Sequence, residues 1–220
     1  AGLAHRIPSL TINKLCGSSL KSAMLAVQAI QNDDAQVIIA GGMENMSRSP
    51  YLLEAHRFGN KFGHGDVKDT LLFDGLYCSL IGEHMGVTAE NIAKKYRITR
   101  ELQDEYAVSS HQKAIRAIEQ GIFDQEIIPI EISNGKKSHI FSSDEQPRKD
   151  TSLEALRKLT PVFKKNGSVT AGNACPINDG AAALVIAGGR FVKKRALVPM
   201  AIIRGYASVG LNPRYMGMGA

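Results

Sequence analysis

A strand, a tight turn, a helix and a second strand follow one another within the first 40 residues, and this order constrains the fold more than any other feature. Residues 9–14 (SLTINK) are β-branched and roughly alternating, which predicts a strand. After a Cys-Gly-Ser-Ser turn, apolar residues between Leu20 and Ile30 recur at helical spacing. Residues 37–40 (VIIA) form a continuous apolar run, typical of a strand covered on both faces. Together these segments predict a βαβ unit and therefore an α/β fold.

The rest of the chain predicts more helices and strands, interrupted by an aperiodic excursion from residue 47 to about residue 75. Helices are expected over residues 88–96, 99–120 and 151–159, and strands over residues 127–132, 181–187 and 200–209. Thr88 is the expected N-cap of the first helix, and Gly121 is the expected stop of the second. Residues 133–150 are polar and indicate a loop.

Charge and hydropathy exclude several classes of protein. The 27 Lys and Arg residues against 21 Asp and Glu give a net charge of +6, which suits an anionic ligand. Basic residues are scattered except at 190–195, where a solvated face is the ordinary interpretation, and no basic stripe with interleaved aromatics indicates a nucleic-acid module. No apolar run reaches the roughly 18–20 residues of a membrane helix, so no membrane insertion is expected.

The three cysteines do not form a disulfide or zinc pattern. Cys16, Cys78 and Cys175 are an odd and widely spaced set without a CxxC pair. We therefore expect a reducing compartment, the cytoplasm or, in a eukaryotic source, the mitochondrion or peroxisome, and no metal site.

Cys16 is the sharpest candidate for chemistry. It lies where the first strand turns into the helix, so the N–H groups of the first helical turn favour a thiolate over a thiol. Gly17 and the small Ser18 and Ser19 leave room for a second group beside the sulfur, as around an activated nucleophile. An inert buried cysteine is an equally weighted alternative.

His84 is the most interesting histidine, because small residues flank it just before a predicted helix. This pattern indicates either a ligand-lining turn or a hydrogen-bonded structural histidine, and nothing in the sequence alone pairs His84 with Cys16.

Several long motifs, in the same order, resemble the thiolases over essentially the whole chain. They are residues 13–19 (NKLCGSS), 40–47 (AGGMENMS), 84–91 (HMGVTAEN), 169–174 (VTAGNA) and 178–183 (NDGAAA). The resemblance implies a thiolase-like layered α/β/α fold with a mixed sheet and an inserted loop domain, here truncated at both ends. Residues 1–46 and 178–198 would belong to the N-terminal domain and linker, 47–177 to the loop domain, and 199–220 to the start of the C-terminal domain.

The same resemblance implies an acetyl-CoA acyltransferase in which the Cys16 thiolate attacks an acyl-CoA and forms an S-acyl-enzyme. Backbone N–H groups, including that of Cys16, would stabilise the oxyanion. His84 and Met85 match positions at the acyl end of the pocket and favour short acyl chains. The matched substrate and coenzyme A contacts are Leu76, His84, Met85, Arg148, Phe163, Ala171, Cys175, Ile177 and Met216. Coenzyme A would be a substrate or product and no cofactor would be permanently bound, in a homotetramer or homodimer.

Two departures from the family pattern matter for function. Cys175-Pro176 stands where the family usually carries Ser-Gly, which removes a hydroxyl contact to the pantetheine arm. The family's NEAF, GHP and CxGGG segments, with their catalytic Asn, His and second Cys, are absent from these 220 residues. We therefore expect the chain to be inactive alone.

Two other readings stay open at this point: a ketoacyl synthase, which would carry different residues around the cysteine, and a non-catalytic thiolase-like protein that binds coenzyme A or lipid.

Overall fold

The computed structural model describes residues 2–135 and 137–219. The chain forms two compact units, each made from two stretches of sequence. The first comprises Ala1–Gly75 and Ile177–Val209, and the second comprises Leu76–Pro176 and Gly210–Ala220. The domain boundaries expected at residues 46, 177 and 198 stay a prediction.

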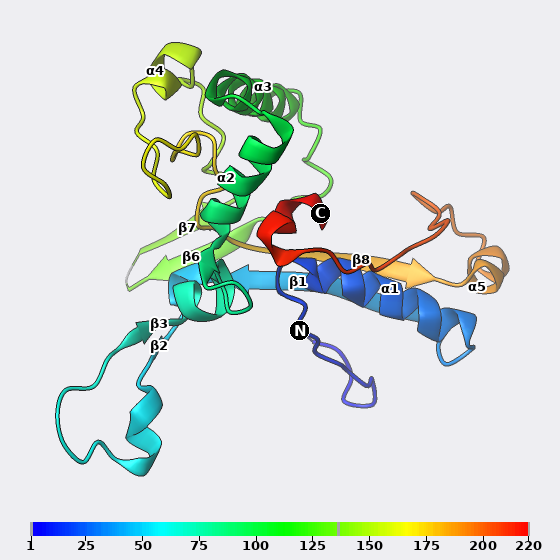
Figure 1. Cartoon of the computed structure of the whole chain (residues 1–220). Helices are drawn as coiled ribbons and strands as arrows, with labels where there is room; N and C mark the ends of the chain where they lie inside the picture. The colour runs from blue at the N-terminus through cyan, green and yellow to red at the C-terminus, as the bar shows by residue number, and fades with distance from the viewer. Residues whose placement is uncertain (1, 136, 220) are drawn as a thin grey trace. The chain divides into compact units, whose positions relative to one another are not determined.

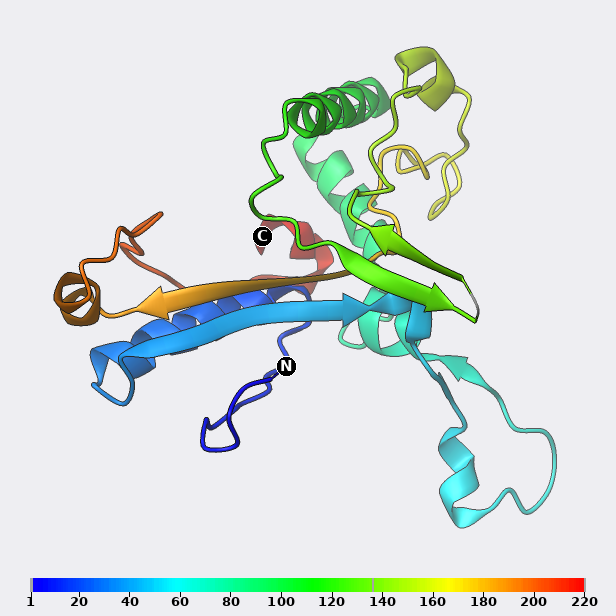
Figure 2. The ribbon, with the colours of Figure 1, turned by 180° about the vertical axis from the view of Figure 1, so that it is seen from behind.

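The first unit is built on a long two-stranded ribbon with a helix along it (Figures 1 and 2). Strand β1 (Val37–Asn45) pairs antiparallel with β8 (Asp179–Ala187) along its whole length, from Val37 opposite Ala187 to Asn45 opposite Asp179. The 3₁₀ turn η1 (Leu15–Gly17) leads into helix α1 (Ser18–Gln31), which packs on β1. The predicted helix after the Cys-Gly-Ser-Ser turn is therefore confirmed, as are both apolar strands.

Two glycines of β1 set how closely α1 approaches. A Cβ atom at Gly42 would lie 2.6 Å from the Cβ of Ser19, and Ser22 Oγ donates a hydrogen bond to the Gly41 carbonyl at 2.9 Å. Only a residue without a side chain allows this approach, so the first turns of α1 rest directly on the strand backbone.

Some predictions about the first unit are wrong. Residues 9–14 and 200–209 contain no strand, and none of the described strands pairs with them, so the predicted βαβ unit is not formed there. A strand needs a neighbour for its backbone hydrogen bonds, which an alternating pattern does not supply. The ribbon is also not covered on both faces: in β1 only Ala40 is buried, while Ile39 is 57% and Val185 72% exposed.

The excursion after β1 contains only short elements, in agreement with its lack of a steady period. They are η2 (Met46–Arg48), β2 (Tyr51–Leu52), η3 (Glu54–Phe58), β3 (Lys68–Asp69) and the short π-helix η4 (Leu71–Leu76), and β2 pairs with β3. The basic segment after β8 is helical, as α5 (Gly189–Lys194).

The second unit contains the longest helix of the described residues, which has 20 residues. The paired strands β4 (Tyr77–Cys78) and β5 (Glu83–His84) precede α2 (Met85–Tyr96), α3 (Arg100–Glu119), the hairpin β6 (Ile130–Asn134) and β7 (Lys137–Phe141), α4 (Leu153–Arg157) and η5 (Pro213–Gly219). Within this unit α2 contacts η5, and α3 contacts α4.

The predicted helices over residues 88–96 and 99–120 are confirmed as α2 and α3, but the N-cap expected for α2 is wrong. Thr99 caps α3 by accepting from the Leu102 N–H, and Gly121, with φ of 65°, follows its end as expected. The N-cap of α2 is His84 instead of Thr88. Thr88 lies inside the helix, is 1% exposed, and donates a hydrogen bond through its hydroxyl to the Met85 carbonyl. The polar loop expected at 133–150 also contains β7, which folds back on β6.

Buried carboxylates hold the second unit together. Glu90 on α2 is 7% exposed and accepts from the N–H groups of Ser168 and Val169, at 2.7 and 2.8 Å. Asp104 on α3 is 1% exposed and accepts from Asn173 Nδ2 at 2.9 Å. These charge-assisted hydrogen bonds fasten the segment 168–173 to both helices.

We predict that Glu90→Ala lowers the free energy of unfolding by about 2–4 kcal/mol, because two backbone N–H groups lose their acceptor. The measurement is urea unfolding of the purified chain. Glu154→Ala is the matched control: it removes an exposed partner of Lys158, 2.8 Å away, and should cost less than about 0.5 kcal/mol. Equal losses in the two variants would contradict the structural role of Glu90.

Candidate active site

Cys16 is exposed and lies in the turn that opens α1. It is the middle residue of η1, and Gly17 is the N-cap of α1. The helix is 14 residues long, and its first N–H groups have no acceptors within the helix. The position therefore agrees with the turn-to-helix placement expected from the sequence, although the preceding segment is not a strand.

The turn around Cys16 is held by its own hydrogen bonds. Leu15 has φ of 48°, the left-handed region that residues with a side chain avoid. Its N–H donates to Asn13 Oδ1 at 2.8 Å. The Ser18 hydroxyl accepts from the Lys14 N–H at 2.8 Å and donates to the Leu15 carbonyl at 2.7 Å. Sequence reasoning treated Ser18 only as a small residue and gave Asn13 no role; the short spacing of these polar groups was the available signal.

His84 lies against an aromatic ring in the second unit. The rings of His84 and Phe163 are stacked, with centroids 4.7 Å apart and planes inclined by 20°. A Cβ atom at Gly86 would come within 2.3 Å of the Phe163 ring, so this glycine makes room for the stack. The sequence predicted both residues as ligand contacts, and the structure brings them together.

The environment of His84 favours the neutral ring. Burial lowers the pKa of His84 below its ordinary value of 6.5. The Gly86 N–H donates to His84 Nδ1 at 2.9 Å, so the proton of the neutral ring is on Nε2. His84 is thus a hydrogen-bond donor through Nε2 at neutral pH.

We predict an NMR titration midpoint for His84 below 6.5. Because the folded pKa is the lower one, the contribution of His84 to stability is complete above the unfolded pKa and is lost as the pH falls below it. Phe163→Ala should shift the midpoint upward, since it removes the ring that covers His84. A wild-type midpoint at or above 6.5 would show that burial does not control this group.

The ten predicted site residues divide between the two units. Cys16 and Ile177 belong to the first, and the other eight belong to the second. Leu76, Met85 and Phe163 are partly buried like His84, whereas Arg148, Ala171, Cys175, Ile177 and Met216 are exposed.

Arg148 is held by its neighbours in the second unit. Its backbone N–H donates to His111 Nδ1 at 3.1 Å, and its Nε lies 3.4 Å from Asp150 Oδ1. The guanidinium lowers the pKa of Asp150 through this hydrogen bond and through its charge. Both side chains are more than two thirds exposed, so the pair leaves Arg148 accessible.

A hydrogen-bond pair joins two of the quoted motifs in the first unit. Ser47, at the end of segment 40–47, donates through its N–H and its hydroxyl to the carboxylate of Asp179, in segment 178–183. These bonds lower the pKa of Asp179. Because 132 residues separate the partners, no local pattern could have predicted the contact.

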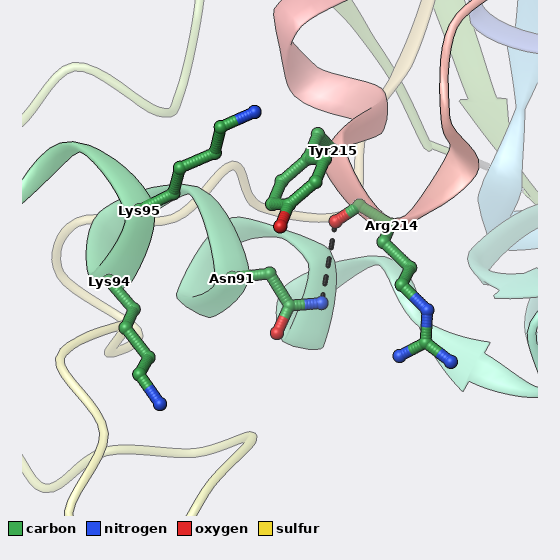
Figure 3. A pocket seen from close by; sticks show the side chains of 5 residues that line it. All are labelled: Asn91, Lys94, Lys95, Arg214 and Tyr215. Atoms are coloured by element: carbon green, nitrogen blue, oxygen red, sulfur yellow. Dashed lines mark hydrogen bonds between the residues drawn. The ribbon is translucent and has the colours of Figure 1, made fainter.

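A basic hollow lies between α2 and η5 and is lined by none of the predicted site residues, although Met216 follows the lining residue Tyr215 in η5 (Figure 3). Asn91 donates to the Arg214 carbonyl at 3.3 Å, and Lys95 Nζ lies 4.1 Å from the centre of the Tyr215 ring. Lys94 points away from the other lining side chains. These contacts fasten η5 to α2.

Residues 2–135 and 137–219 contain neither a group of metal ligands nor a membrane-spanning helix. No three His, Cys, Asp or Glu side chains there are grouped as metal ligands. None of the helices formed by these residues has the length and apolarity to cross a membrane.

Comparison with known proteins now identifies the family. A family model described as the thiolase N-terminal domain matches residues 1–189. The chain belongs to the thiolase family. Acetyl-CoA acetyltransferase of Escherichia coli is 54% identical over all 220 residues. The chain spans about 56% of the length of that thiolase, and the same share of the other curated relatives.

Solved thiolase structures share the fold. Acetyl-CoA acetyltransferase from Syntrophomonas wolfei matches with a TM-score of 0.94 at 43% identity, over 99% of this chain and 55% of that one. Human mitochondrial 3-ketoacyl-CoA thiolase matches with a TM-score of 0.93, also at 43% identity and with the same coverage. The thiolase-like α/β fold expected from the motifs is therefore confirmed.

Proposed function

We propose that this thiolase chain carries the acylation site of an acyl-CoA acyltransferase that forms or cleaves acetoacetyl-CoA or another 3-ketoacyl-CoA. The observation that carries the proposal is an exposed Cys16 in a hydrogen-bonded turn at the start of α1. The printed names of the relatives, acetyl-CoA acetyltransferase and 3-ketoacyl-CoA thiolase, support this reaction class.

The first chemical step is transfer of an acyl group to sulfur. The Cys16 thiolate attacks the thioester carbonyl carbon, a C–S bond forms, and the carbonyl electron pair moves to oxygen. Backbone N–H groups, including that of Cys16, stabilise this oxyanion. When the oxyanion collapses, the original C–S bond breaks and coenzyme A leaves as a thiolate, which takes up the proton lost by Cys16.

The other matched residues bind the substrate in this proposal. His84, a neutral donor packed against Phe163, lies at the acyl end together with Met85 and favours short chains. The exposed Arg148 faces the phosphate-rich nucleotide end, where a positive charge is stabilising. Coenzyme A is then a substrate or product, with no permanently bound cofactor. The same proposal includes a homotetramer or homodimer and a cytoplasmic location or, in a eukaryotic source, a mitochondrial or peroxisomal one.

We predict that the intact protein incubated with acetyl-CoA carries an acetyl group on the peptide containing Cys16, detected by mass spectrometry. Cys16→Ser should abolish the thioester adduct. Cys78→Ser is the matched control, since Cys78 is a free cysteine outside the predicted site residues, and should leave the adduct unchanged. An unmodified Cys16 peptide in the wild-type protein would favour the non-catalytic alternative, a protein that only binds coenzyme A.

The 220-residue chain assayed alone should not sustain turnover of acetoacetyl-CoA and coenzyme A. The family's NEAF, GHP and CxGGG segments, whose side chains move protons at the substrate, are absent from this sequence. The spectrophotometric assay is compared with the acetyl adduct on the same preparation, because in this proposal acylation uses Cys16 and the substrate contacts that this chain contains. Robust turnover would contradict the proposal that this chain supplies the acylation step while the NEAF, GHP and CxGGG segments supply the proton transfers.

A further inference from the structure

The peptide group between Leu15 and Cys16 is held from one side by a single residue. The carbonyl of Leu15 accepts both from the Ser18 N–H and from the Ser18 hydroxyl, the latter at 2.7 Å. A trans peptide is planar, so its C=O and N–H point in opposite directions. Holding the Leu15 oxygen therefore directs the Cys16 N–H to the other side of the turn.

The Leu15–Cys16 peptide can rotate about ψ of Leu15 and φ of Cys16 if it is not held, and φ of Leu15, at 48°, would not change. Rotation of the Leu15–Cys16 peptide would replace the N–H beside the Cys16 sulfur with a carbonyl. The structure opposes that rotation mainly through Ser18.

The Ser18 hydroxyl also connects the turn to a rigid element. It accepts from the Lys14 N–H at 2.8 Å, so one oxygen bridges the residues on both sides of the Lys14–Leu15 peptide. Ser18 is the first residue of α1, and one turn later Ser22 fastens the helix to the Gly41 carbonyl. The orientation of the Leu15–Cys16 peptide is thus fixed relative to the β1–β8 ribbon, because Ser18 belongs to the helix that packs on it.

We infer that Ser18 is a positioning residue for acyl transfer, whose hydroxyl keeps the Cys16 N–H directed toward the oxyanion. The inference rests on the proposed function, because it needs Cys16 as the nucleophile. It assigns to Ser18 an effect on oxyanion stabilisation and not on the sulfur itself. That distinction makes it testable, since alkylation of a thiolate forms no oxyanion at a carbonyl.

The test compares two reactions of Cys16 in the intact protein. Ser18→Ala should slow acetylation by acetyl-CoA about tenfold, as expected when an oxyanion donor is misdirected but retained. The same variant should change the rate of Cys16 alkylation by iodoacetamide less than about twofold, because that reaction needs the thiolate only. Ser18→Thr keeps the hydroxyl and should restore acetylation.

Ser110→Ala is the matched control: it removes an exposed serine hydroxyl from helix α3, outside the Cys16 turn, and both rates should stay within about twofold of wild type. Circular dichroism confirms that each variant is folded. Equal slowing of acetylation and alkylation by Ser18→Ala, or no slowing of either, overturns the inference while the proposed function stands. Failure of the wild-type protein to acetylate Cys16 overturns the proposed function and the inference with it.

Discussion

The close approach of α1 to β1 is the constraint on which the first unit depends. Gly42 has no side chain where Ser19 packs, and Ser22 reaches the Gly41 carbonyl, so the helix start is set by strand backbone. Cys16 lies two residues before the first residue of this helix, so its position depends on that of the helix start. A larger residue at position 42 would move the helix together with the turn, because interiors do not absorb such changes without displacement.

The second unit uses the same combination of a missing side chain and a polar clamp. The absence of a side chain at Gly86 leaves room for the Phe163 ring to stack on His84. Four residues later, the Glu90 carboxylate accepts hydrogen bonds from backbone N–H groups of the segment that follows Phe163. Helix α2 therefore carries both the glycine that makes room for Phe163 and the carboxylate that binds the segment after it. Burial of His84 then follows from packing, and with it the neutral ring that donates through Nε2.

Local patterns predicted local elements well and failed where a distant partner decides. The spacing of apolar residues predicted α1 and α3, and Gly121 marked the end of α3. Residues 9–14 alternate like a strand, yet the described chain offers them no neighbour. Thr88 looked like a cap because Ser and Thr favour that position, but tertiary packing buried it one turn inside the helix.

By itself the sequence determined the helices, the apolar strands and the motif order that identifies a thiolase, because periodicity and motifs are properties of neighbouring residues. Only the tertiary structure decided that β1 pairs with β8, that Ser47 binds Asp179 and that Phe163 covers His84. These contacts join residues roughly 80 to 150 positions apart, and the free energy of such pairing depends on which surfaces meet after folding. The role of Ser18 depends on both kinds of information. Its partners Leu15 and Lys14 are only three and four residues away, but the left-handed backbone of Leu15 that brings them together is visible only in the folded chain.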